Sequence, residues 1–138
     1  MTEIYVNAAP VLNVRPIGPA IRRGFLGRCP RCGEGRMFRA YLKVVDDCAM
    51  CGEELKHQRA DDAPAYLTML IVGHFIVAGV LAEDELFPDA NMLVVGLGWS
   101  LAVIAISLLV LPRIKGALVG YQWAMRMHGF GGPETEFM

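Results

Sequence analysis

The sequence predicts a small α-helical membrane protein whose main element is a hairpin of two transmembrane helices. Of the 138 residues, 54% are apolar and only 20% are charged, whereas about a quarter of the residues in soluble domains are charged. The charges are also segregated, because residues 65–82 and 92–111 contain no charged side chain. This pattern indicates a polar N-terminal head followed by membrane helices, rather than one buried soluble core.

The hairpin is predicted to cover residues 61–112, with helices at about 64–82 and 92–111. At 1.5 Å per residue, each helix extends about 27–30 Å, which matches the hydrocarbon core of a bilayer. We expect Asp62 to cap the first helix and Pro64 to lie in its first turn, where a missing N–H group costs nothing. Pro112 is expected to end the second helix. A buried helical hairpin in a soluble protein is the alternative interpretation.

The distribution of cations predicts the orientation of this hairpin. Ten of the thirteen Lys and Arg residues lie in residues 1–62, whereas the connecting segment 83–91 is acidic and contains neither. Because positively charged segments remain on the cytoplasmic side, both termini are expected to be cytoplasmic. The lipid bilayer is therefore the first expected partner.

The four cysteines form two Cys-x-x-Cys pairs in a predicted zinc ribbon at residues 25–60, which follows an N-terminal tail at 1–24. The ligands are Cys29, Cys32, Cys48 and Cys51. Fifteen residues separate the two pairs, a spacing typical of a structural zinc site. Four thiolates would hold one Zn²⁺ per chain in a closed tetrahedral site without an open position for catalysis. A four-thiolate iron centre is the main alternative, and disulfides are less compatible with a reducing cytoplasm.

Beyond the second helix, residues 113–130 are predicted to form an amphipathic helix in the headgroup plane, followed by a tail at 131–138. This segment mixes Lys, Arg, Trp and Tyr with aliphatic residues, as interfacial helices do. Arg113 and Lys115 are expected to stay in the interface, where they could also contact a partner.

Three ionisable residues of the hairpin are further candidates. His74 lies near the middle of the first span, and intramembrane ionisable groups are functional candidates by default. It could instead form a structural hydrogen bond to a neighbouring helix. Asp61 and Asp62 stand where the first helix begins, and capping accounts for at least one of them. A paired-carboxylate acid–base site is the alternative there.

Several short segments together resemble a known family. They are the two cysteine pairs, residues 35–38, 59–66, 73–74, 112–116 and 122–130. Over residues 24–130 the chain resembles a bacterial, mainly alphaproteobacterial, family of short membrane proteins catalogued as a domain of unknown function. The resemblance implies location in the bacterial inner membrane. Because some members are encoded beside cytochrome c oxidase and its assembly factors, it also implies association with an aa3-type oxidase. It further suggests a contact role for Trp123, Arg126 and His128, with interface anchoring as the alternative.

Three function classes follow. The first is a non-enzymatic accessory or assembly factor that docks on other membrane protein subunits. The second is an electron- or haem-handling protein that uses the cysteines or His74. The third is a membrane-tethered nucleic-acid binder using the basic stretch 15–43, although this stretch has few aromatic platforms for bases. An enzyme is not expected, because the sequence contains no phosphate-binding glycine loop, nucleophile elbow or His-Glu metalloprotease motif.

Overall fold

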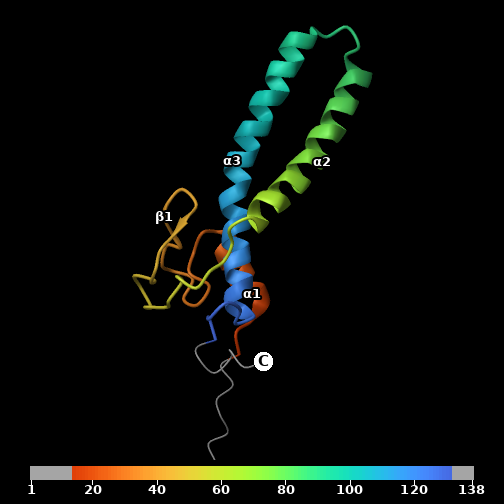
Figure 1. The fold of residues 1–138 in the computed structure, drawn as a ribbon. Coiled ribbons are helices and arrows are strands. Elements are labelled where there is room, and N and C mark those ends of the chain that lie inside the picture. Colours follow the sequence, from red (N-terminus) through yellow and green to blue (C-terminus); the bar gives the residue numbers. More distant parts are fainter. Residues whose placement is uncertain (1–13, 132–138) are drawn as a thin grey trace, which may run out of the picture.

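The computed structural model describes residues 14–131 as three helices and one short β hairpin (Figure 1). In chain order these elements are α1 (Ile17–Phe25), β1 (Phe38–Ala40), β2 (Lys43–Val44), α2 (Ala63–Leu86) and α3 (Met92–Ala124). α2 and α3 form a long hairpin, whereas α1 and the strands gather around the C-terminal part of α3 (Figure 1). Residues 1–13 of the predicted N-terminal tail and 132–138 of the predicted C-terminal tail lie outside the described residues.

Both helices of the hairpin are long and apolar enough to cross a membrane. α2 has 24 residues and α3 has 33, and the most apolar stretches have mean hydropathies of 2.1 and 2.5. Only 11% of that stretch in α2, and none of it in α3, is buried. The core helix of a soluble protein would be mostly buried, whereas the described chain leaves this apolar surface uncovered. The expectation of two long apolar helices is confirmed.

α2 begins as the sequence predicts but ends one turn later. Pro64 lies in the first turn, as expected, whereas the side chain of Asp62 makes no capping hydrogen bond. The prediction of a cap by this carboxylate is therefore wrong, because the backbone of Asp62 is already helical (φ −96°, ψ −30°). The helix continues to Leu86 because glutamate is a good helix former. It ends before Pro88, which restricts the residue ahead of it to extended conformations.

One close contact between α2 and α3 lies near their connection. The Trp99 indole packs on Gly79, where any Cβ atom would overlap the ring. Its Nε1 donates a hydrogen bond of 3.0 Å to Glu83 Oε2. By contrast, a Cβ atom added at Gly73, Gly96 or Gly98 would meet nothing within 4 Å among the described residues. Those small residues leave helix surfaces that nothing in the described chain covers.

α3 does not end at Pro112, as the sequence led us to expect, but continues through it to Ala124. Proline has no N–H group, so it leaves the Leu108 carbonyl without its partner in the helical hydrogen-bond ladder. The Tyr41 hydroxyl donates a hydrogen bond of 2.8 Å to this carbonyl. The turn between the strands therefore supplies the donor that proline lacks.

The predicted interfacial helix at 113–130 is consequently not a separate element. Residues up to Ala124 belong to α3, and Ile114, Val119 and Trp123 are buried against the N-terminal part of the chain. Tertiary packing accounts for the difference, since one side of this segment packs on α1 and on the segment between α1 and α2, the head, whereas Tyr121 and Met125 remain exposed. Residues after Ala124 form turns.

The Tyr41 bond gives a testable coupling. Tyr41→Phe is expected to lower the free energy of unfolding by about 1 kcal/mol, because it removes one hydrogen bond and leaves a carbonyl unpaired. In a Pro112→Ala background the same change should cost less, since alanine restores the N–H donor to Leu108. Thermal unfolding of the four proteins of this double-mutant cycle measures the coupling. Equal costs in both backgrounds would contradict the assigned role of Tyr41.

α1 occupies part of what the sequence suggested was an N-terminal tail. Its buried residues are Ala20 and Gly24, which are four positions apart. A Cβ atom at Gly24 would collide with the Gly116 carbonyl, and one at Gly120 would collide with the Ala20 carbonyl. Two small-x-x-x-small pairs therefore allow α1 and α3 to lie backbone against backbone, as in closely packed membrane helices.

The head shares its core with α3. β1 and β2 pair antiparallel, with Phe38 opposite Val44. Residues 41–42 form the turn between them, with Leu42 at φ 60°. The core cluster consists of Ala20, Met37, Leu55, Ala60, Val119, Trp123 and Phe130. Because α3 contributes to this cluster, the small head does not depend on its own apolar residues alone.

Candidate metal centre

The two cysteine pairs meet in one cluster at the side of the head. The sulfur atoms of Cys29, Cys32, Cys48 and Cys51 all lie within 4.8 Å of one another. The Sγ atoms of Cys29 and Cys51 are 3.7 Å apart, and those of Cys32 and Cys48 are 3.8 Å apart. A tetrahedral ion with bonds of about 2.3 Å to sulfur requires S···S separations of about 3.8 Å. The predicted four-cysteine grouping is confirmed, and its dimensions fit one metal ion such as zinc.

The same turn presents the first cysteine of each pair. Gly33 N–H donates to the Cys29 carbonyl at 2.8 Å, and Gly52 N–H donates to the Cys48 carbonyl at 2.9 Å. Both glycines have positive φ, 74° and 72°, a conformation that glycine adopts without steric cost. The Cys-x-x-Cys-Gly pattern therefore encodes two equivalent turns, which could hold one metal ion between them.

Gly35 packs directly against the cysteine cluster. Its N–H group donates to Cys32 Sγ at 3.5 Å, and a side chain at this position would collide with Cys48 Sγ. Its carbonyl accepts a hydrogen bond of 2.8 Å from Cys29 N–H. A residue between the two pairs thus contacts three of the four ligands, which the spacing of the cysteines did not reveal.

The thiols have divergent acidities. Burial raises the pKa of Cys29 well above its ordinary value, and burial likewise raises that of Cys51. At Cys32 burial also acts to raise the pKa. Backbone hydrogen bonds from Gly35 and Glu34, with the neighbouring thiols, outweigh it and lower the pKa to about 6. Four thiolates in this space need a compensating cation, which a divalent metal ion supplies.

Glu53 joins the metal-binding turns to α3. Its carboxylate accepts a hydrogen bond of 2.8 Å from Trp123 Nε1 and forms an ion pair of 3.1 Å with Arg31 in the first turn. Arg15 lies 3.8 Å from the same carboxylate, with its guanidinium 4.5 Å from the centre of the Trp123 ring. Sequence reasoning missed Glu53, because its partners come from three distant parts of the chain.

Trp123 is therefore buried, whereas the sequence suggested a surface position. It was a candidate for a partner contact or a membrane anchor, but only 6% of it is exposed. That prediction is wrong, because the indole is buried in the shared core and its N–H is bonded to Glu53. Arg126 and His128, its companions in the prediction, are exposed in turns beyond α3.

Gln122 makes a second attachment, which joins α3 to the segment that leads into α2. Its Oε1 accepts from Arg59 N–H and its Nε2 donates to the Arg59 carbonyl, both at 3.0 Å. The side-chain amide thus pairs with one backbone residue as a neighbouring strand would. Together with Glu53, it fixes the head to α3 by polar contacts on two sides.

The Glu53 contacts predict a specific loss of stability. Glu53→Gln is expected to lower the free energy of unfolding by about 1–3 kcal/mol, because the side chain is only 14% exposed and loses charge-assisted bonds. Glu54→Gln is the matched control, since Glu54 is 54% exposed and pairs with Lys56 at the surface. Its effect should be clearly smaller. Thermal unfolding of the metal-loaded protein measures both, and equal shifts would contradict the role assigned to Glu53.

The remaining predicted residues lie away from the metal centre. Asp61 and Asp62 are exposed at the start of α2. Arg113 donates to the carbonyl of Leu109 in its own helix at 2.9 Å, and Lys115 is half-buried. The structure brings none of these four to the cysteines.

The basic stretch 15–43 uses several of its cations within the molecule. Arg15 donates to the carbonyls of Trp123 and Phe130 at 2.9 and 3.0 Å. Arg23 donates to the carbonyls of Pro30 and Arg31 at 3.1 and 2.9 Å. These guanidinium groups stabilise the fold, so they count against nucleic-acid binding by the stretch as a whole.

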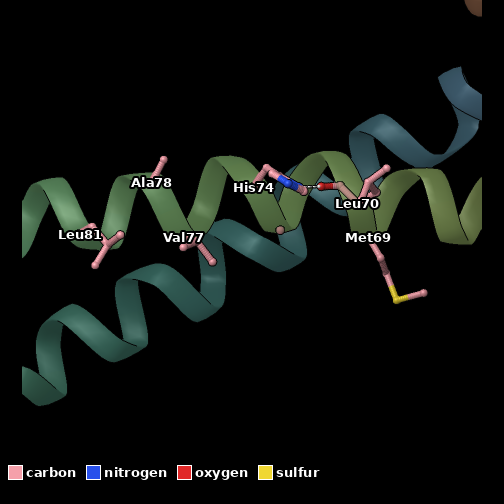
Figure 2. Close-up of a pocket in the computed structure, with 7 residues that line it drawn as sticks. Met69, Leu70, His74, Val77, Ala78 and Leu81 are labelled. Atoms are coloured by element: carbon pink, nitrogen blue, oxygen red, sulfur yellow. Dashed lines mark hydrogen bonds between the residues drawn. The ribbon is translucent and has the colours of Figure 1, made fainter.

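His74 lies on the outer surface of α2 and does not bond to α3 (Figure 2). Its Nδ1 is 2.6 Å from the carbonyl oxygen of Leu70, one turn earlier. A carbonyl only accepts hydrogen bonds, so Nδ1 carries the proton and neutral His74 keeps a lone pair on Nε2. The expected structural bond to a neighbouring helix is replaced by one within α2, and Nε2 has no hydrogen-bond partner among the described residues.

Comparison with known proteins places the chain in one family. The family described as "Protein of unknown function (DUF983)" matches residues 38–123, from β1 to the last turn of α3. This range includes the second cysteine pair and the whole hairpin but not the first pair. No curated protein and no solved structure matches the chain. Since the match covers more than half of the sequence, the protein belongs to the DUF983 family.

Proposed function

We propose that this protein is a non-enzymatic accessory or assembly factor of a bacterial inner membrane, built around a structural zinc site. One observation carries the proposal: the four sulfurs lie within 4.8 Å of one another, in a head that is fixed to a long apolar helix. A four-thiolate ion leaves no coordination position for a substrate. The metal would hold the head in shape, and the protein would act through what it contacts.

The exposed apolar hairpin supports the membrane location. In water the uncovered surface of α2 and α3 would be strongly unfavourable, whereas in a bilayer it lies in its preferred environment. The acidic connection between the helices and the cations around the head favour an orientation with both termini in the cytoplasm. In this arrangement the metal centre is cytoplasmic and the α2–α3 connection lies on the other side.

The partner we propose is another membrane protein complex, with an aa3-type cytochrome c oxidase first among the candidates. The oxidase comes from the family resemblance alone. The docking of some transmembrane helix is supported by Gly96 and Gly98 of α3, which have no neighbour within 4 Å of a Cβ position. Small residues at open positions let a second helix approach closely in lipid.

Gentle detergent purification of the tagged protein from its own membranes tests this proposal. Protein mass spectrometry, metal analysis and a visible spectrum are recorded on one sample. We expect about one zinc per chain, no haem band and enrichment of oxidase subunits. Gly98→Leu should lose the partner while keeping zinc, whereas Gly98→Ala, which keeps a small residue at the same position, should retain both. Iron or haem without a stable partner would overturn the proposal.

A haem- or electron-handling role is the second candidate, and His74 favours it. In metal sites a ligating histidine usually donates its other ring N–H to a carbonyl or carboxylate. The Nδ1–Leu70 bond has this form and leaves Nε2 available as a ligand. A haem band that is present in the native protein and absent in His74→Ala, with zinc unchanged, would support this role. A colourless native protein would exclude it.

A further inference from the structure

Two segments, one at the end of α1 and one in the head, reach the level at which the hairpin enters the proposed bilayer. The first is the C-terminal end of α1, where Phe25 lines an apolar groove together with Leu67 and Ile71 of α2. These two residues lie about 6 and 12 Å along α2 from Ala63, at 1.5 Å per residue, and therefore inside the predicted span. Phe25 is 45% exposed and its neighbour Leu26 is 63% exposed.

The second part is the turn of the β hairpin. The Tyr41 hydroxyl bonds to the carbonyl of Leu108, which belongs to the predicted second span, 92–111. Tyr41 is nevertheless 53% exposed. Figure 1 shows this turn beside α3, at about the level where α2 begins. The head therefore extends along α3 rather than ending below the hairpin.

Exposed cations flank both apolar tips. Along the chain, Arg22 and Arg28 flank the Phe25–Leu26 tip, and Arg39 and Lys43 flank Tyr41. All four are exposed. Apolar and aromatic side chains bordered by Lys and Arg are typical of segments that insert into the boundary between headgroups and acyl chains. The cations complement the negative surface potential of a leaflet that contains anionic lipids.

We propose that these residues form a collar that embeds in the cytoplasmic leaflet and binds anionic phospholipid. The collar comprises Arg22, Phe25, Leu26, Arg28, Arg39, Tyr41 and Lys43. It replaces the expected interfacial helix at 113–130 with two separate segments, the end of α1 and the β turn. The apolar tips lie at the headgroup end of the acyl chains, and the cations lie among the phosphates. This inference rests on the membrane location in the proposed function.

Depth-dependent fluorescence quenching tests the collar. The full-length protein is reconstituted in phosphatidylcholine and phosphatidylglycerol vesicles whose acyl chains are brominated near the headgroup. Leu26→Trp and Ala40→Trp each add one tryptophan at an exposed position of a tip. The added emission should be clearly quenched, because interfacial segments are buried about 5–10 Å into the boundary between headgroups and acyl chains, which is the depth of the bromines. Val14→Trp, 78% exposed before the opposite end of α1, is the control and should not be quenched.

The native tryptophans separate failure of the collar from failure of the membrane location. Trp99 lies on the hairpin and Trp123 in the core, so quenching of the unmodified protein reports on insertion of the hairpin. Quenching of native protein without quenching of the two added tryptophans would overturn the collar alone, and would indicate that a protein partner or a second copy covers the tips. No quenching of any sample would overturn the membrane location.

The anionic preference has its own test. A variant with glutamine at the four flanking positions should no longer retain spin-labelled phosphatidylglycerol in preference to phosphatidylcholine. Glutamine substitution of Lys56 and Arg126, which lie outside the collar, should leave the preference unchanged. An unchanged preference in the four-position variant would overturn the charge part of the proposal.

Discussion

Cys48→Ser is expected to release the metal and unfold the head while the α2–α3 hairpin stays intact. Cys48 is 3% exposed, and its sulfur lies 3.8 Å from that of Cys32. Binding of structural zinc contributes about 10–16 kcal/mol to the folding of small zinc domains, so the loss of one ligand should affect the head more than any other single change. Metal analysis should show a fall from about one zinc per chain to nearly none. Limited proteolysis should then cleave within residues 25–60.

Met50→Ser is the matched control for this change. Met50 lies between Cys48 and Cys51 and is 65% exposed, so its replacement should leave zinc and protease resistance unchanged. If Cys48→Ser keeps its metal and its resistant head, the cluster is not a metal site of the form described. Iron in place of zinc in the native protein would keep the structural prediction and change only the identity of the ion.

Gly116→Leu is expected to separate α1 from α3. A Cβ atom at this position collides with the backbone carbonyl of Gly24, and backbone atoms cannot move aside as a flexible side chain can. Overpacking of this kind typically costs about 1–3 kcal/mol, and a backbone collision should place the cost at the upper end. Thermal unfolding should shift accordingly, and protease should cleave at Arg22 or Arg23 once α1 is released.

Gly96→Leu provides the comparison within the same helix. A Cβ atom at Gly96 meets nothing within 4 Å among the described residues, so leucine there should be tolerated in detergent. Similar destabilisation by both substitutions would mean that the effect arises from the helix itself and not from its contact with α1. Zinc content should stay near one per chain in both variants if the metal site folds independently of this contact.

Sequence reasoning succeeded where the signal is local. The absence of charge from 65–82 and 92–111 predicted the hairpin, because a helix that faces lipid cannot carry unpaired charges. The Cys-x-x-Cys spacing predicted the cluster of four cysteines, because two intervening residues bring both sulfurs of a pair to one ion. Each of these conclusions needed only residues close together in the chain.

It failed where a distant residue decides the local structure. Pro112 is ordinarily a reason to end a helix, and only the bond from Tyr41 to the Leu108 carbonyl explains why α3 continues. α1 was missed for a related reason. The spacing of Ala20 with Gly24, and of Gly116 with Gly120, is visible in the sequence. That the two pairs face each other follows only from the fold.

Because α3 is one continuous helix, it connects the two ends of the molecule mechanically. Its 33 residues extend about 50 Å along one helix, which starts at the acidic connection and ends beside the four-cysteine head. A tilt of about 10° around its midpoint would move each end by about 4 Å in opposite directions. Because α3 runs as one helix from this connection to the head, a partner that tilted the hairpin at its connecting end would also displace the cysteine cluster at the other end of the molecule.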